Sequence, residues 1–183
     1  MNTNRLSKTI SDALNGQITK EAFASQIYLS YASWADRQGL RGIANFLFRH
    51  SQEERNHMMK LVEYILNRGA EVKITSIPAP PENPENLNSC FKNIFEHETD
   101  NTKAVYKLVK LSLIEEDWAT YNFMQWFVKE QIEEETLAMN LLDKIKLAGG
   151  EKVSISSLYS LDRDMAKTSD EVRPAQDITA VNP

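Results

Sequence analysis

One long connection, rich in proline, divides this chain into two halves of helical sequence. It reads GAEVKITSIPAPPENPENLN from Gly69, and four of the six prolines of the chain fall in it, between Pro78 and Pro84. About twenty extended residues span roughly 60 Å, whereas a helix of about 28 residues is roughly 40 Å long. The connection can therefore run the whole length of a helical bundle. Its prolines prevent it from continuing as helix.

Helical periodicity marks four long segments and a short one on either side of this connection. They run from about Ser7 to Arg37, Leu40 to Gly69, Leu87 to Glu115, Asp117 to Ala148, and Ser156 to Lys167. Short links make the first two segments, and likewise the third and fourth, antiparallel neighbours. The sequence thus predicts an all-α fold, a four-helix bundle with one long crossover between its second and third helices and a short fifth helix. We expect residues 1–167 to form this domain and residues 168–183 to be a disordered tail.

Charge and composition exclude several other classes of protein. The net charge of −5 argues against a nucleic-acid partner. No apolar stretch is long enough for a membrane span, and the first ten residues do not resemble a signal peptide. A single cysteine, Cys90, rules out internal disulfides and cysteine-rich metal sites. We therefore expect a protein of the reducing cytoplasm.

Several glutamates occupy positions where a helix should be apolar. Residues seven apart in a helix differ in direction by only about 20° and so form a row along one side of it. A glutamate whose neighbours in its row, seven residues before and after, are both apolar is expected to face the interior. Five of them lie between apolar residues: Glu21 (Leu14, Tyr28), Glu54 (Leu47, Leu61), Glu98 (Phe91, Val105), Glu130 (Phe123, Leu137) and Glu134 (Phe127, Leu141). Glu135 also passes the test, between Val128 and Leu142, because the fourth segment is apolar over a wide arc. Each long segment therefore supplies at least one inward-facing carboxylate.

These carboxylates need a counter-charge, because a bare carboxylate in a core costs several kcal/mol. No lysine or arginine lies in the rows of Glu21, Glu54, Glu98 or Glu134. The charges of these four would instead balance two divalent ions. His57, one turn after Glu54, would add an imidazole, and an oxygen-rich set with one imidazole suits Fe(II) or Mn(II) better than structural zinc. His50 lies seven residues before His57, so spacing alone leaves either histidine as the ligand.

Two motifs resemble a known family. FLFRHSQEERNHMMKL and YNFMQWFVKEQIEEETL are similar to the matching helices of bacterial non-haem ferritins, and the resemblance covers about residues 5–167. It implies an iron site A at Glu21, Glu54 and His57, and a site B at Glu54, Glu98 and Glu134, with Gln131 beside site B. It also implies a third iron site, whose carboxylates match Glu53, Glu130, Glu133 and Glu134. Tyr28 and Trp126 match aromatic residues close to the di-iron centre, although either alone is more often a core aromatic, and a structural role is expected for His50.

The resemblance also implies a function. Family members are ferroxidases, which oxidise Fe(II) with O2 or H2O2 and store the Fe(III) mineral inside a hollow cage of 24 identical subunits. Haem is not expected, because Arg55 stands where bacterioferritins carry a haem-binding methionine. Gln131 and Glu134 replace a second Glu-x-x-His, which also disfavours bacterioferritins. The main alternative, a rubrerythrin-like oxidase, would need a cysteine-rich iron domain that one cysteine cannot form, and a purely structural cage subunit would lack the ligands.

Overall fold

The structure, a computed structural model, describes residues 3–167 of the 183 residues. Its helices are α1 (Lys8–Arg37), α2 (Arg41–Asn67), α3 (Leu87–Ile114), α4 (Trp118–Leu147) and α5 (Ile155–Met165), with a 3-10 turn η1 (Gly150–Lys152) before α5. The described part contains no strand. The expected tail, residues 168–183, lies outside the described residues.

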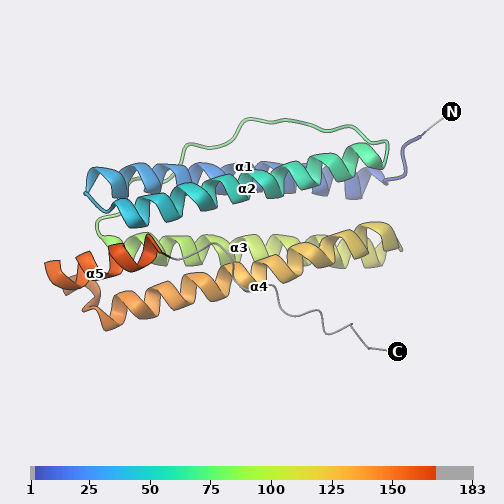
Figure 1. Cartoon of the computed structure of the whole chain (residues 1–183). Coiled ribbons are helices and arrows are strands. Elements are labelled where there is room, and N and C mark those ends of the chain that lie inside the picture. Colours follow the sequence, from blue (N-terminus) through green and yellow to red (C-terminus); the bar gives the residue numbers. More distant parts are fainter. Residues whose placement is uncertain (1–2, 168–183) are drawn as a thin grey trace, which may run out of the picture.

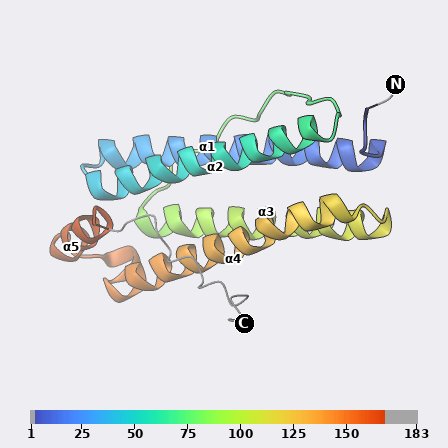
Figure 2. The ribbon, with the colours of Figure 1, turned by 45° about the vertical axis from the view of Figure 1, so that its right-hand side comes forward.

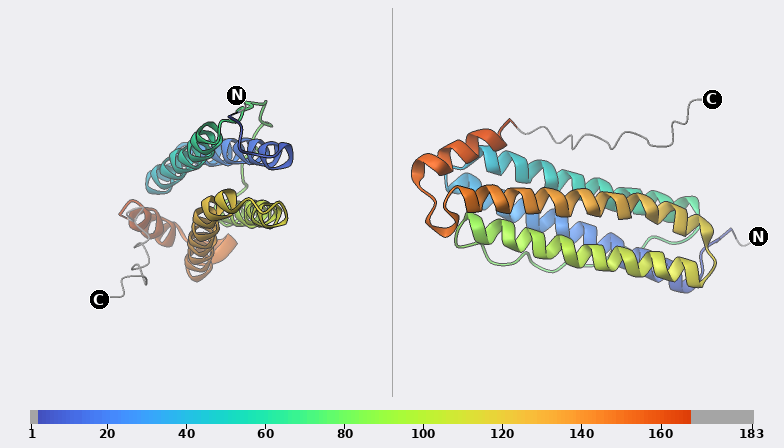
Figure 3. Two further views of the ribbon diagram at one scale, coloured as in Figure 1. Left: turned by 90° about the vertical axis from the view of Figure 1, so that its right-hand side faces the viewer. Right: turned by 90° about the horizontal axis from the view of Figure 1, so that it is seen from below.

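Two antiparallel hairpins, α1–α2 and α3–α4, pack against each other to form a four-helix bundle (Figure 1). Seen along the bundle axis, the four long helices surround a common centre (Figure 3). The crossover, residues 68–86, leaves the end of α2 and returns along α1, so that α3 begins at the opposite end and runs parallel to α2 (Figure 1). The predicted all-α bundle with a crossover is confirmed.

Helix ends fall within two residues of the predicted bounds, because several of the predicted first residues are caps. The Ser7 side chain accepts a hydrogen bond from the Ile10 amide, and the Asp117 side chain accepts one from the Thr120 amide. Such caps satisfy amides that have no partner within the helix. Gly39 closes the turn between α1 and α2 at φ 81°, a conformation that glycine adopts without steric cost.

Hydrogen bonds hold the crossover along α1. The Asn15 side-chain nitrogen donates to the Glu71 carbonyl at 3.1 Å, and its side-chain oxygen accepts from the Lys73 backbone amide at 2.6 Å. Further along, the hydroxyls of Thr19 and Thr75 lie 2.8 Å apart. The irregular backbone of the crossover thus finds partners on the surface of α1, as backbone polar groups near a core require.

The short helix α5 packs across the end of the bundle against α2, near one end of both hairpins (Figure 2). A Cβ added at Gly42 would lie 1.9 Å from the Asp162 carbonyl oxygen, so the two backbones approach more closely than a side chain permits. The Ile43 amide donates to the Asp162 carboxylate at 2.9 Å. The position of α5 therefore depends on a glycine at the start of α2.

The bundle core consists of two apolar clusters separated along its axis. One contains Ile27, Phe46, Phe91 and Leu141 with residues of α5, and the other contains Ile10, Leu61, Val105 and Phe127. One buried glutamate of each long helix lies between the two clusters in the sequence of that helix: Glu21, Glu54, Glu98 and Glu134. No helix in residues 3–167 has the length and apolarity to cross a membrane.

Candidate metal centre

Each long helix buries one glutamate near the middle of the bundle. The exposed fractions are 0% for Glu21 on α1, 1% for Glu54 on α2, 0% for Glu98 on α3 and 5% for Glu134 on α4. Within residues 3–167, none of these four forms an ion pair with lysine or arginine. The four carboxylates that the apolar rows of the sequence indicated are therefore buried without a cationic side chain.

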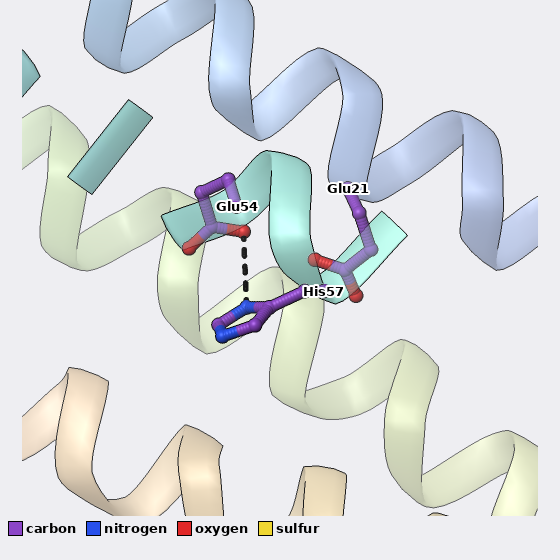
Figure 4. A group of neighbouring side chains, drawn as sticks. All are labelled: Glu21, Glu54 and His57. Atoms are coloured by element: carbon purple, nitrogen blue, oxygen red, sulfur yellow. Dashed lines mark ion pairs between the residues drawn. The ribbon is translucent and has the colours of Figure 1, made fainter. Parts of the chain in front are cut away.

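The tightest donor group joins α1 and α2. One ligand atom each from Glu21, Glu54 and His57 lie within 4.8 Å of one another. Glu54 and His57 face each other from successive turns of α2, with 3.6 Å between Oε2 and Nδ1, while Glu21 reaches toward them from α1 (Figure 4). Glu54 Oε2 is buried and accepts no hydrogen bond from the described residues. This group can therefore offer three ligand atoms, from two carboxylates and one imidazole, to a single ion.

Burial sets the protonation of this group in the absence of a cation. Burial, and then the charges of Glu98 and Glu21, raise the pKa of Glu54 well above 4.5. Burial likewise raises the pKa of Glu21 and Glu134, and brings the pKa of Glu98 to about 7. Burial also lowers the pKa of His57 to about 4, so its imidazole is neutral at pH 7. Neutral imidazole and displaceable carboxyl protons are the state from which a divalent ion binds.

Glu98 approaches the same region from α3, held by hydrogen-bond donors. The Tyr28 hydroxyl donates to its Oε1 at 2.8 Å, and the amide nitrogen of Gln131 lies 3.4 Å from its Oε2. Glu98 belongs to none of the groups of three or more close donors that residues 3–167 contain. A second ion between Glu54, Glu98 and Glu134 would therefore require the carboxylates to draw together around it.

Two further donor groups share residues with the first. One contains Glu53, His57 and Glu130, where His57 Nε2 lies 3.8 Å from a Glu130 oxygen. Glu53 joins His50 and Glu134 in the other, with His50 Nδ1 3.4 Å from Glu53 and 3.7 Å from Glu134.

The structure thus distinguishes the two histidines that spacing could not. His57 lies with Glu21 and Glu54 as well as with Glu53 and Glu130, whereas His50 lies only with Glu53 and Glu134 among the donor groups of residues 3–167. Of the carboxylates expected at the third site, Glu133 is in no donor group and lies 3.9 Å from Lys129 instead.

The aromatic residues expected near the centre are in contact with it. The Trp126 and His57 rings are nearly perpendicular, with 5.3 Å between their centroids. The Lys60 ammonium lies over the Trp126 ring, 4.2 Å from its centroid. Tyr28 stacks on His50 at 5.5 Å. Both aromatic residues therefore adjoin histidines of the candidate donor groups.

Two buried residues at the centre were missed from the sequence, Gln17 and Asn101. Both hydrogen bond to Glu21. The row test would have found them, because Gln17 lies between Ile10 and Ala24, and Asn101 between Ile94 and Leu108.

Known proteins share this arrangement of helices. A family model for the ferritin-like domain matches residues 11–148, a segment that includes every candidate ligand. A bacterial non-haem ferritin from Campylobacter jejuni is 41% identical over 144 residues, which are 79% of this chain and 86% of the relative. A probable bacterial non-haem ferritin-like protein from Haemophilus influenzae is 35% identical over 164 residues, 90% of this chain and 98% of the relative. Among solved structures, an open-pore ferritin from Archaeoglobus fulgidus has a TM-score of 0.85 at 36% identity, with 90% of this chain and 98% of that chain covered.

Proposed function

This chain belongs to the ferritin-like family, and we propose that it is an iron-storage subunit that oxidises Fe(II) at the buried carboxylate centre and deposits Fe(III) inside a cage of identical chains. One observation carries the proposal: each of the four long helices buries a glutamate at the same level, beside a neutral histidine, with no lysine or arginine to offset the charge. The carboxylate-rich donor set, with one imidazole at its tightest group, suits Fe(II).

Binding would begin at the group that is already assembled. Neutral His57 offers Nδ1, and Glu21 and Glu54 offer oxygens, to the first Fe(II) ion. Glu54 would then bridge to a second Fe(II) held by Glu98 and Glu134. The carboxyl protons that burial retains would leave as the ions arrive, since both compete for the same oxygens.

Oxidation removes one electron from each of the two substrate ions. O2 takes up these two electrons and two protons and leaves as H2O2. If H2O2 is the oxidant, two electrons and two protons convert it to two water molecules. Fe(III) brings more positive charge than the four carboxylates offset, which favours departure toward further carboxylates. Glu53 and Glu130 adjoin His57 and would receive it, with Glu133 one turn after Glu130 on α4.

A third ion at Glu53, Glu130, Glu133 and Glu134 is part of the proposal, supported by the two donor groups that share Glu53. Its test is the double variant Glu130→Ala/Glu133→Ala. The first two ions should still oxidise quickly, while the ratio of iron oxidised to O2 consumed changes because one electron donor is missing. An unchanged ratio would show that these carboxylates bind no specific ion.

Aerobic Fe(II) oxidation, followed by absorbance and combined with size-exclusion chromatography, tests the function. Wild-type protein should elute as a large shell, oxidise Fe(II) rapidly and retain iron after desalting. Glu54→Ala should assemble equally well and lose roughly a hundredfold in initial rate, since it removes the shared ligand. Glu96→Ala, an exposed glutamate of α3, serves as the control and should match wild type. Wild-type rates in Glu54→Ala would refute the assignment, and a small oligomer that oxidises Fe(II) without retaining it would indicate a di-iron oxidase instead.

A further inference from the structure

A chain of buried side-chain amides links the carboxylates of α1 and α3. Its members are Gln17, Asn101 and Gln131, with exposed fractions of 2%, 4% and 2%. The Gln17 nitrogen donates to Glu21 and to the Asn101 oxygen, both at 2.7 Å. The Asn101 nitrogen lies 3.3 Å from the Gln131 oxygen and 3.4 Å from a Glu21 oxygen. The Gln131 nitrogen, in turn, faces Glu98 at 3.4 Å.

The ends of this chain determine the orientation of every amide in it. Once a bound ion has displaced its proton, a carboxylate only accepts hydrogen bonds, so in that state Gln17 must present its NH2 group to Glu21. The same nitrogen meets Asn101, which must therefore present its oxygen there and its nitrogen to Gln131. Gln131 then accepts with its oxygen and turns its NH2 group toward Glu98, which is again an acceptor. The orientation that starts at Glu21 agrees with the one that ends at Glu98.

The amide chain also gives Gln131 a defined role. Its oxygen, the atom that could bind a metal ion, is occupied by Asn101. Its nitrogen is shared between Glu98 and the Thr102 hydroxyl, the latter at 3.2 Å. In this arrangement Gln131 orients Glu98 rather than ligating an ion, and Asn101 is the residue that holds it so.

We propose that Gln17 and Asn101 are positioning residues that hold the Glu21 carboxylate in its ion-binding orientation. The proposal rests on the proposed function, since it concerns the ligands of the same centre. Glu21 projects from α1 toward ligands that are both on α2, and it receives its hydrogen bonds from these two amides. Without them, its side chain loses the donors that select one rotamer, and part of the binding energy is then spent on ordering it.

Binding of Co(II), a divalent probe that is not oxidised under these conditions, tests the proposal without any catalytic turnover. The d–d absorption of Co(II) during a titration reports both affinity and coordination. Asn101→Leu, which keeps the shape of the side chain, and Gln17→Met, which keeps its length, should each weaken the first Co(II) site by roughly ten- to a hundredfold. In the double variant the loss should be smaller than the product of the two single losses, because both residues act on one carboxylate.

Asn15→Leu provides a matched control. Asn15 is another buried amide of α1, but its partners are Glu71 and Lys73 of the crossover. Its variant should keep Co(II) affinity within about twofold of wild type. Two results would overturn the positioning role: wild-type affinity in both Asn101→Leu and Gln17→Met, or an equal loss in all three variants, which would reveal general loosening. A wild-type protein that binds no Co(II) would instead overturn the proposed function itself.

Discussion

His57 connects two parts of the candidate metal centre, because its two ring nitrogens face two different donor groups. Nδ1 lies 3.6 Å from Glu54, and Nε2 lies 3.8 Å from Glu130. A carboxylate that hydrogen bonds to the second nitrogen of a metal-binding histidine fixes the tautomer and orientation of its ring, and Glu130 is close enough to do so after a small movement. Trp126 packs against the ring edge and restricts its rotation further. One imidazole can therefore bind the first ion through one nitrogen and contact the carboxylates of the neighbouring donor group with the other.

Replacing either histidine of α2 should accordingly have a different effect on Fe(II) binding. We expect His57→Ala to weaken the first Fe(II) site by roughly a hundredfold, because it removes a ligand that lies among Glu21 and Glu54. His50→Ala should leave the Fe(II) affinity of that site within about twofold of wild type and alter only the binding of later ions. Anaerobic Fe(II) titration by calorimetry measures both. Equal losses in the two variants would contradict the placement of His57.

The buried carboxyls should also make the metal-free protein less stable as the pH rises. A carboxyl whose pKa is higher in the folded than in the unfolded state stabilises the fold while protonated, and loses this contribution as the pH rises through the folded pKa. Burial raises the pKa of Glu98 to about 7 and that of Glu54 well above 4.5. His57 and His97 act in the opposite sense, but only below pH 6.5, because their pKa values are lowered to about 4. The free energy of unfolding should therefore fall as the pH rises from 6.5 through about 7, the folded pKa of Glu98, and above it.

Denaturant unfolding of chelator-treated protein at several pH values measures this trend. Glu54→Gln keeps the shape of the side chain and removes its titration, so its curve should be flatter than that of wild type. The exposed Glu96→Gln should follow wild type. A free energy of unfolding that rises over this range in wild type would be incompatible with protonated carboxyls at the centre.

Among the elements, α5 is the one that meets a neighbouring helix where the backbones leave no room for a side chain. Gly42 lets the α2 backbone approach the Asp162 carbonyl, where a Cβ would be 1.9 Å away. Gly42→Ala should therefore displace α5 and cost about 1–3 kcal/mol, the usual range for overpacking. Gly16 is the matched control, since a Cβ added there meets nothing within 4 Å. Gly16→Ala should stabilise α1 by about 0.5–1 kcal/mol.

Denaturant unfolding gives both free energies, and amide hydrogen exchange in residues 155–165 reports the docking of α5. Faster exchange confined to α5 in Gly42→Ala is the expected pattern. Similar free energies of unfolding for the two alanine variants would mean that α5 can move aside at no cost.

The long helices and the buried carboxylates could be predicted from the sequence, but their cross-helix partners could not. A glutamate between Leu47 and Leu61 is a strong signal, because a charge in an apolar row needs a specific explanation. Which amide meets which carboxylate depends on how α1, α3 and α4 are rotated about their axes, and periodicity does not define that rotation. The contact of Asn101 with Gln17 is of this kind. The same limit applies to α5, whose existence was predicted from its pattern while its docking at Gly42 was not.

At the scale of the whole molecule, the polar centre separates two apolar clusters, and two bound ions that share Glu54 would together join all four helices between them. A ligand that binds only the folded state stabilises it by about 2.7 kcal/mol at a concentration 100 times its Kd. We expect Co(II) to raise the unfolding temperature of wild-type protein by several degrees, and a chelator to reverse the change. Glu54→Ala should unfold at a temperature that Co(II) barely alters. Thermal unfolding followed by circular dichroism makes the comparison, and an equal shift in wild type and Glu54→Ala would place the bound ion elsewhere.

The division of ligands between the hairpins has a consequence during biosynthesis. Glu21, Glu54 and His57 all belong to α1 and α2, whereas Glu98 and Glu134 arrive only with α3 and α4, beyond the crossover. A ribosome translating the crossover has already synthesised Glu21, Glu54 and His57, the three candidate ligands of the first hairpin, while the residues that would enclose them are not yet made. Any discrimination between iron and competing cations that depends on the second hairpin is therefore absent in the nascent chain and arises only once translation has passed Glu134.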